Sequence, residues 1–143
     1  MQLTPRFSFC IALDIMLTST YSGDSYTTIK FDINSSQRPS LPLTPLGLPY
    51  PGLGSPNGPS WSAYLTYHFN YSATLTYNVA FGGATVDRYI VTPFLDLIWT
   101  FREQVTKWLL KLGNHPNTAP WTGSNSLFFF WFGINDLWRS SGK

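Results

Sequence analysis

The feature that most constrains the fold is an uninterrupted apolar run near the end of the chain, residues 127–132, Leu-Phe-Phe-Phe-Trp-Phe. The run is short enough for a strand, and a strand without polar residues is expected where both of its faces are covered. Strands of this kind occur in parallel sheets that lie between layers of helices. We therefore expect residues 127–132 to form a parallel strand that is buried on both faces.

The preceding residues alternate between strand and helix patterns. Residues 17–22 and 74–80 are rich in β-branched and aromatic side chains, as is typical of strands. Between them, Ser60 is a suitable N-cap for a short helix over residues 61–69. Strand, helix, strand, helix and strand in this order predict an α/β fold, a three-layer sandwich with a parallel sheet.

The clearest helix is expected over residues 93–112. Thr92 would be its N-cap, Pro93 its first residue, and Gly113 would end it. Apolar residues recur along this segment at intervals of three and four, which forms one stripe. The members of the stripe are Phe94, Ile98, Phe101, Val105, Trp108 and Leu112. A stripe of this kind could bind a partner, but packing against the core is its common role.

Composition and charge limit the classes of function. A chain of 143 residues can form one modest domain with its own core. Its net charge of +2 comes from scattered basic residues, so the clustered basic face of a nucleic-acid-binding protein is not expected. No apolar stretch is long enough to predict a membrane span. The single cysteine, Cys10, can form neither an intrachain disulfide nor a cysteine-based metal cluster, and we expect no metal and no cofactor.

Residues 31–59 hold most of the chain's 11 prolines and several glycines, so neither a helix nor a regular strand is favoured there. The composition would fit a disordered linker. Against that alternative, the segment contains many apolar side chains that could anchor it, among them Leu41, Leu43, Leu46 and Leu53. We expect an ordered surface loop that borders the functional site.

The first residues resemble a signal peptide, with Arg6 followed by the apolar residues 7–13. Asp14 interrupts this run shortly before the first expected strand. We expect residues 1–16 to be either a signal peptide or an eroded N-terminus, and residues 17–143 to be the folded domain. Two Asn-x-Ser triplets, at Asn34 and Asn70, favour a secreted, extracellular protein, whose signal peptide is either functional or defective.

Three of the predicted strands end in residues that acyl-transfer chemistry can use. Residues 23–25 (Gly-Asp-Ser) follow the first strand, Gly82 and Gly83 follow the second, and Asn135 follows the third. In a parallel sheet these ends share one edge, where open α/β sheets place their ligands. A serine hydroxyl is a nucleophile once a base removes its proton, and backbone N–H groups with an asparagine amide can form an oxyanion hole. Each motif alone is also a common turn sequence.

These motifs resemble the blocks of the SGNH (GDSL-type) hydrolases. The blocks stand here as Gly-Asp-Ser at 23–25, Asn-Val-Ala-Phe-Gly-Gly at 78–83 and Gly-Ile-Asn-Asp at 133–136. The flanking segments, such as Pro-Tyr-Pro-Gly at 49–52 and Asn-Gly-Pro-Ser-Trp at 57–61, are similar to those of the fungal carbohydrate esterase family sixteen acetylesterases. The resemblance runs from about residue 21 to 137. It implies an SGNH hydrolase or flavodoxin-like fold and a serine esterase that removes acetyl groups from carbohydrate or small acetyl esters.

By this resemblance Ser25 would be the nucleophile, and the oxyanion hole would consist of the N–H groups of Ser25 and Gly83 with the side-chain amide of Asn135. The family's base lies in an Asp-x-x-His block, and neither His68 nor His115 has an aspartate three residues before it. We therefore expect a partial SGNH domain, truncated at its C-terminus and inactive as given. The alternatives are an inactive fragment without a function of its own and a non-catalytic glycan-binding module.

Overall fold

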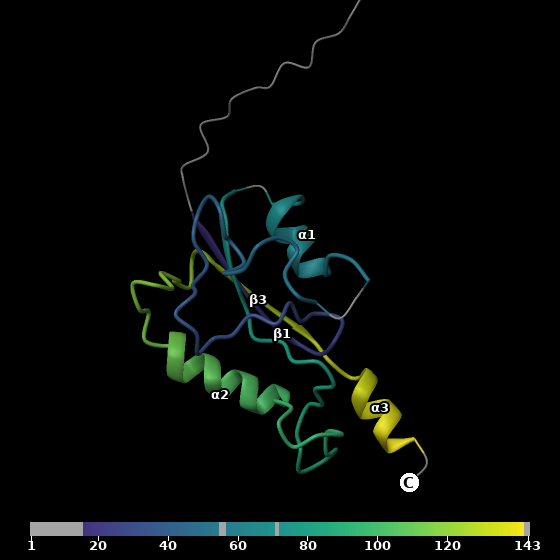
Figure 1. The fold of residues 1–143 in the computed structure, drawn as a ribbon. Helices are drawn as coiled ribbons and strands as arrows, with labels where there is room; N and C mark the ends of the chain where they lie inside the picture. Colours follow the sequence, from purple (N-terminus) through teal and green to yellow (C-terminus); the bar gives the residue numbers. More distant parts are fainter. Residues whose placement is uncertain (1–15, 55–56, 71, 142–143) are drawn as a thin grey trace, which may run out of the picture.

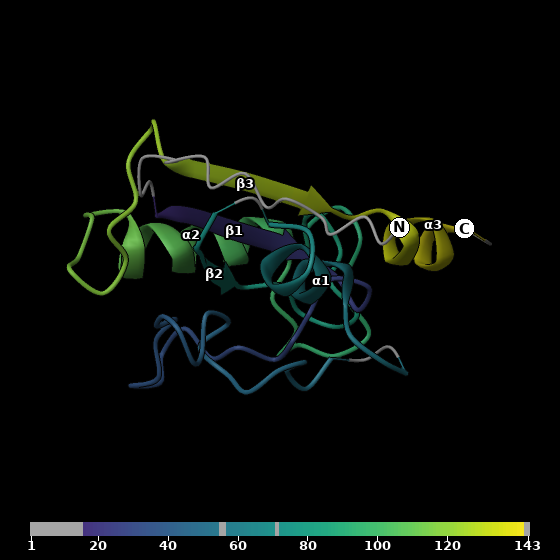
Figure 2. The same ribbon diagram turned by 90° about the horizontal axis from the view of Figure 1, so that it is seen from above.

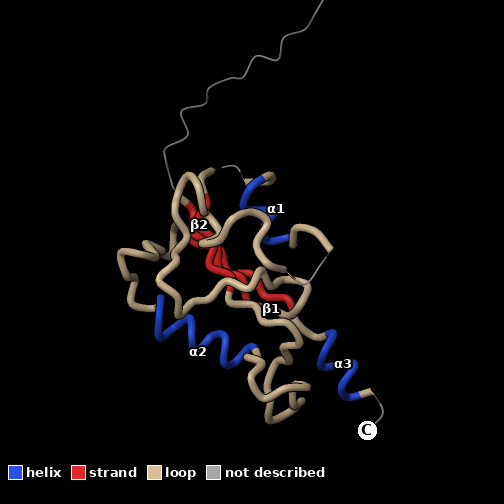
Figure 3. Tube along the Cα trace, viewed as in Figure 1, coloured by secondary structure: helices blue, strands red, loops and turns tan. Residues whose placement is uncertain are grey.

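A parallel sheet with strand order β2-β1-β3 forms the centre of the molecule, and the computed structural model describes residues 16–54, 57–70 and 72–141 (Figures 1 and 3). The strands are β1 (Leu17–Gly23), β2 (Thr74–Asn78) and β3 (Ser126–Trp131). The register aligns Tyr21 of β1 with Asn78 of β2, and Gly23 of β1 with Trp131 of β3. All three strands therefore end at the same edge of the sheet.

Helices cover the two faces of this sheet, so the three-layer α/β sandwich expected from the sequence is confirmed (Figure 1). Helix α1 (Trp61–Tyr67) lies on the face of Tyr21, whose ring contacts that of Trp61 edge-on at 5.0 Å between centroids. Helix α2 (Phe101–Leu112) lies on the opposite face, where the indole Nε1 of Trp108 donates to Thr20 Oγ1 at 3.1 Å. Successive strand residues point to opposite faces, which explains this division. Helix α3 (Ile134–Ser140) extends beyond the edge at which the strands end.

The short helix α1 begins where the sequence predicts. Ser60 is its N-cap, and its hydroxyl accepts a hydrogen bond from the N–H of Ala63 at 3.3 Å. The side of the helix that faces the sheet carries Ser62, Ala63 and Thr66, and all three are buried. Small side chains allow the helix to approach the sheet closely, and the hydroxyl of Thr66 bonds that of Thr76 on β2 at 2.7 Å.

The predicted start of the long helix at Thr92 and Pro93 is wrong, because α2 begins at Phe101. Thr100 is the N-cap, and its backbone N–H donates to the carboxylate of Glu103 at 2.9 Å, as in a capping box. Before the helix, the backbone carbonyl of Ile98 accepts a hydrogen bond from the guanidinium of Arg88 at 2.9 Å. The helix ends at Leu112 with Gly113 as its C-cap, as predicted.

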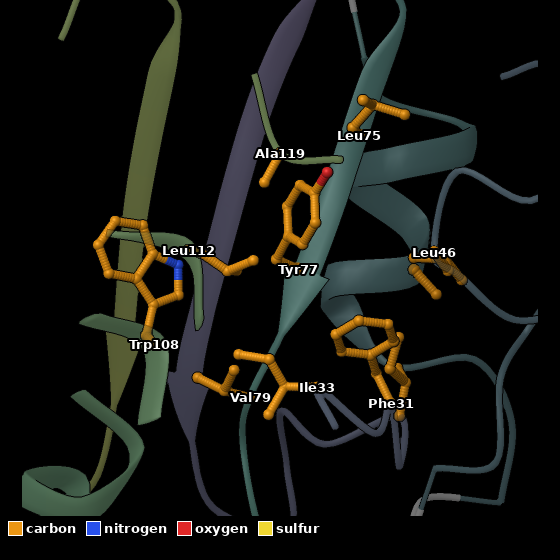
Figure 4. Close-up of a cluster of buried hydrophobic side chains, with 11 residues drawn as sticks. Phe31, Ile33, Leu46, Leu75, Tyr77, Val79, Trp108, Leu112 and Ala119 are labelled. Carbon is orange, nitrogen blue, oxygen red and sulfur yellow. The ribbon is translucent and has the colours of Figure 1, made fainter. Parts of the chain in front are cut away.

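The core lies between the sheet, α2 and the proline-rich loop (Figure 4). The sheet and helix contribute Leu75, Tyr77, Trp108 and Leu112, and Val79 follows directly after β2. The loop contributes Phe31, Ile33 and Leu46, which are almost completely buried. In contrast, Leu41, Leu43 and Leu53 are exposed, so only some of the expected anchors of this loop reach the core.

The expectation that the apolar run is buried on both faces is wrong. Leu127, Phe128, Phe130 and Trp131 are all exposed, between 41% and 58%. The reason is the place of β3 in the described sheet, where it is an outer strand with β1 along one side only, while α1 packs mainly on β2 and α2 mainly on β1 (Figure 2). Phe129 is better covered because its ring stacks on Tyr21 at 4.7 Å between centroids.

The expected signal peptide or eroded N-terminus over residues 1–16 and the cysteine Cys10 lie outside the described residues, apart from Met16, which packs against the core.

Candidate active site

The turn that carries Ser25 follows directly from the end of β1. Its first residue, Gly23, has no room for a side chain, because a Cβ atom there would lie 2.6 Å from Thr27 Oγ1 and 2.9 Å from the carbonyl oxygen of Trp131. The carboxylate of Asp24 accepts from the N–H of Tyr26 at 3.0 Å, and the carbonyl of Asp24 accepts from the N–H of Thr27 at 3.1 Å. The chain therefore turns sharply out of the sheet, with Ser25 half-buried at the bend.

Asn78, at the end of β2, connects this turn to β2 and to α1 through side-chain hydrogen bonds. Its side-chain nitrogen donates to the carbonyl of Thr27 at 2.8 Å and to the hydroxyl of Ser62 on α1 at 2.9 Å. Its side-chain oxygen accepts from the N–H of Ala80 at 3.1 Å. Because Asn78 is fully buried, these hydrogen bonds are shielded from water and hold the turn, β2 and α1 together.

The chain after β2 continues along the end of β1, since the N–H of Phe81 donates to the carbonyl of Gly23 at 3.0 Å. Gly83 then adopts a φ of +82°, which favours glycine. A Cβ atom at Gly83 would also lie 2.4 Å from Cε1 of Phe94, so the position has no space for a side chain. Gly83 is buried beneath Phe94 at the edge where the strands end.

Two side chains of α3 join the third strand end to the loop of Gly83. The amide nitrogen of Asn135 donates to the carbonyl of Ala84 at 2.9 Å. The carboxylate of Asp136 accepts from the N–H of Val86 at 3.0 Å. An asparagine amide has two N–H groups, so Asn135 keeps one for another acceptor.

The structure therefore links the predicted site residues through their neighbours rather than directly. Gly83 and Asn135 are joined through Ala84, and Ser25 is joined to the same loop through the bond between Gly23 and Phe81. Within the described residues, the hydroxyl of Ser25 makes no hydrogen bond to Gly83, to Asn135 or to a basic side chain. The role of each of the three residues remains a prediction.

Two carboxylates lie at this edge, those of the buried Asp24 and the half-buried Asp136. Asp24 is fully buried, and burial raises the pKa of its carboxyl above the usual range, with the negative charge of nearby Asp136 adding to the rise. Among the described residues, one oxygen of each carboxylate, Oδ2, is buried without a hydrogen-bond partner. A proton on Asp24 would relieve the repulsion between the two groups.

Two hollows flank the turn of Ser25. The first, of about 520 Å³, is lined by Tyr26, Pro59, Ser60, Trp61 and Trp131. The second, of about 530 Å³, lies beside Gly82 and is lined partly by Lys30 and by Phe31, Asp32 and Asn34 of the proline-rich loop. Part of this loop therefore borders the end of β2. Ser25, Gly83 and Asn135 are not among the described residues that line either hollow.

Both histidines lie away from Ser25. His68 is exposed at the C-cap of α1, close to the start of β2, and its Nε2 is 3.2 Å from the hydroxyl of Tyr50. His115 follows α2 and stacks on Trp121, near the start of β3. The described part of the chain thus provides no histidine base at the edge where the strands end.

Two well-placed polar residues were not predicted from the sequence. Asn78 falls within the block that resembles the SGNH hydrolases, but nothing in its local pattern indicated which groups it binds. Gln104 is fully buried on α2 and bonds the backbone of Gly23 at 3.0 Å. The sequence pattern that could have revealed Gln104 is its spacing, three residues after Phe101 and four before Trp108. This spacing places a polar side chain on the apolar face of the helix.

Among the described residues, no group of three or more histidine, cysteine, aspartate or glutamate side chains is placed to hold a metal ion. In the same residues, no helix is long and apolar enough to cross a membrane.

Comparison with known proteins relates the chain to an esterase. It is 40% identical over 116 residues to an acetylesterase of Thermothelomyces thermophilus, a match that covers 80% of this chain. The chain spans 38% of the length of that relative. No protein-family model matches the chain.

Proposed function

We propose that this chain is part of a serine esterase that removes acetyl groups from carbohydrate or from small acetyl esters, with an SGNH-type site and without a metal or organic cofactor. The observation that carries the proposal is the meeting of three strand ends at one edge of the sheet, where the hydrogen bond from Asn135 to Ala84 joins the third end to the loop of Gly83. The 40% identity to an acetylesterase supports the reaction class.

In this proposal Ser25 attacks the acetyl carbonyl after a base takes its proton. The acetyl–enzyme forms as the alcohol leaves, and water then releases acetate and restores the serine. The N–H groups of Ser25 and Gly83, with the free N–H of the Asn135 amide, stabilise the negative oxygen of each tetrahedral intermediate. Ser25, Gly83 and Asn135 are thus the residues proposed for these roles, and no described residue is assigned as the base.

We also propose that the protein is extracellular and does not bind nucleic acid. The exposed side chains of Asn34 and Asn70, both in Asn-x-Ser triplets, support secretion. The scattered positive charge supports the absence of a nucleic-acid partner.

The test uses a hybrid esterase, in which this chain is joined to the portions of the Thermothelomyces acetylesterase that the match leaves uncovered. We expect the hybrid to release acetate from 4-nitrophenyl acetate and from acetylated oligosaccharides. Ser25→Ala should remove this activity, by roughly 10³-fold or more. The control, Ser36→Ala at an exposed position, should retain it. Equal activity in Ser25→Ala and Ser36→Ala would contradict the proposal.

A non-catalytic glycan-binding module is the second candidate, and the hollow lined by Tyr26, Trp61 and Trp131 favours it. Aromatic faces of this kind can pack against sugar rings. If the folded hybrid binds acetylated oligosaccharides but releases no acetate, this candidate replaces the esterase. If it neither binds nor hydrolyses them, the chain is an inactive fragment.

A further inference from the structure

The side chain of Gln104 is completely buried beneath the sheet and uses all of its hydrogen-bonding capacity. Its oxygen accepts from the hydroxyl of Ser22 at 2.7 Å and from the N–H of Gly23 at 3.0 Å. Its nitrogen donates to the carbonyl of Gly23 at 2.9 Å and to that of Trp99 at 2.9 Å. A side-chain amide offers two donor hydrogens and two acceptor lone pairs, and here each has a partner.

These bonds act on the last residue of β1. Gly23 presents both its N–H and its carbonyl to the one amide of Gln104, so the peptide groups on either side of Gly23 cannot rotate without breaking a buried hydrogen bond. Asp24 and Ser25 follow immediately. The orientation of Gly23 therefore sets the direction in which the turn of Ser25 leaves the sheet.

The same carbonyl of Gly23 also accepts the N–H of Phe81, two residues before Gly83. Gln104 and the chain after β2 thus converge on one oxygen atom. Through it, Gln104 is connected with both segments that would provide backbone donors to the oxyanion hole, those of Ser25 and Gly83.

We propose that Gln104 is a positioning residue of the esterase site, which fixes the backbone of Gly23 and thereby the placement of Ser25 relative to the loop of Gly83. This proposal rests on the proposed function for its catalytic consequence. Its structural part, that Gln104 of α2 holds the backbone of Gly23, depends only on the four hydrogen bonds of Gln104.

The competing explanation is that Gln104 merely attaches α2 to the sheet. Trp108 provides the matched control, because it lies one turn further along α2, is buried, and donates to Thr20 of β1 at 3.1 Å. Trp108→Phe removes a hydrogen bond between the same helix and the same strand, but three residues further from the end of β1. Gln104→Met removes the bonds to Gly23 with a side chain of similar length.

The first measurement is hydrogen exchange of the Gly23 N–H by NMR, in the full chain labelled with ¹⁵N-glycine. We expect exchange about three- to tenfold faster in Gln104→Met, the factor equivalent to one lost hydrogen bond. Trp108→Phe should leave it unchanged. Gln104→Glu, which can still accept from the Gly23 N–H, should keep most of the protection and serves if Gln104→Met does not fold. Unchanged exchange in the folded Gln104→Met, equal acceleration in Gln104→Met and Trp108→Phe, or loss of protection in Gln104→Glu would overturn the proposal.

The second measurement is the rate at which a fluorophosphonate labels Ser25 in the hybrid esterase, followed by mass spectrometry of the digested protein. Gln104→Met should slow the labelling of folded protein and Trp108→Phe should not, while equal rates in all three proteins would overturn the positioning role. If the active hybrid esterase is labelled at other residues but not at Ser25, the assignment of Ser25 in the proposed function fails, and the exchange of Gly23 still decides the role of Gln104.

Discussion

The amide of Asn135 donates to the carbonyl of Ala84 at 2.9 Å, which fastens the end of the third strand to the loop after the second. This bond has two consequences for the site. It restrains the direction of the Asn135 side chain, and it uses one of the two N–H groups of the amide, so we expect the other to donate to a substrate oxygen. Asn135 therefore combines a structural contact with a predicted catalytic one.

We expect Asn135→Ala to lower kcat of the hybrid esterase by about 10²–10³, the usual effect of removing one oxyanion donor. KM should change little, because this hydrogen bond strengthens as the oxygen becomes negative. Asn135→Asp should be at least as damaging, since a carboxylate repels the oxyanion and cannot donate to Ala84. Steady-state kinetics and Tm are measured together.

The control at the same turn is Asp136→Asn, which retains an oxygen to accept from Val86 and should keep most of the kcat. If Asn135→Ala lowers Tm while kcat of the folded protein holds, Asn135 is a turn residue only.

Gly23→Ala should destabilise the chain by about 1–3 kcal/mol, the usual cost of forcing extra volume into a packed site. The added methyl group would meet Thr27 Oγ1 at 2.6 Å and, more seriously, the rigid backbone oxygen of Trp131 at 2.9 Å. Urea denaturation measures the free energy of unfolding. Gly123→Ala is the control, because no atom lies within 4 Å of a Cβ atom there, and it should change stability by less than about 0.5 kcal/mol.

The stability of the chain should depend on pH through Asp24. Burial raises the pKa of this carboxyl in the folded state. Between the unfolded and the folded pKa, the native protein therefore holds a proton that the unfolded chain has lost. The free energy of unfolding contributed by Asp24 should therefore fall as the pH rises from the unfolded pKa to the folded one. Glu103 has the opposite dependence, because its hydrogen bond with Arg88 lowers its pKa, and its contribution is lost as the pH falls.

The variant Asp24→Asn distinguishes the contribution of Asp24 to the pH dependence of stability from that of Glu103. Asparagine keeps an oxygen for the N–H of Tyr26 and has no proton to lose, so this variant should match the unaltered chain in acid and exceed it in stability at neutral pH. Urea titrations between pH 3 and 8 would show the difference. A variant that is less stable than the unaltered chain across this whole range would show that the charge on Asp24 is needed.

The strands and their ends could be predicted because each depends on local sequence. Alternation of β-branched residues marks β1 and β2, and a glycine with polar residues close behind it marks the turns at Gly23 and Gly133. The parallel order of strands then brings these ends to one edge, whatever their separation in the sequence.

The features that were missed depend on contacts between distant segments. The start of α2 at Phe101 reflects the bonds of Arg88 to Ile98 and Glu103, which propensities around Thr92 do not show. The exposure of β3 depends on which neighbours the strand has. The contact of Gln104 with Gly23 needs the register of α2 against β1.

The chain by itself should hydrolyse 4-nitrophenyl acetate very slowly or not at all. The described residues place no base on Ser25, and the help of a general base is worth about 10²–10⁴-fold. The hybrid esterase should exceed the chain by at least that factor. Turnover by the chain alone that equals that of the hybrid, and that is lost in Ser25→Ala, would show that a residue of this chain is the base.

The central claim, that Ser25 at the end of β1 is the nucleophile, is tested most directly by locating the covalent intermediate. The hybrid esterase is mixed with 4-nitrophenyl acetate, quenched in acid within the first turnovers, digested and analysed by mass spectrometry. The account predicts an acetyl group on the peptide that contains Ser25, and none on that peptide in Ser25→Ala. An acetyl group on a different residue of an active hybrid, with Ser25 unmodified, would contradict it.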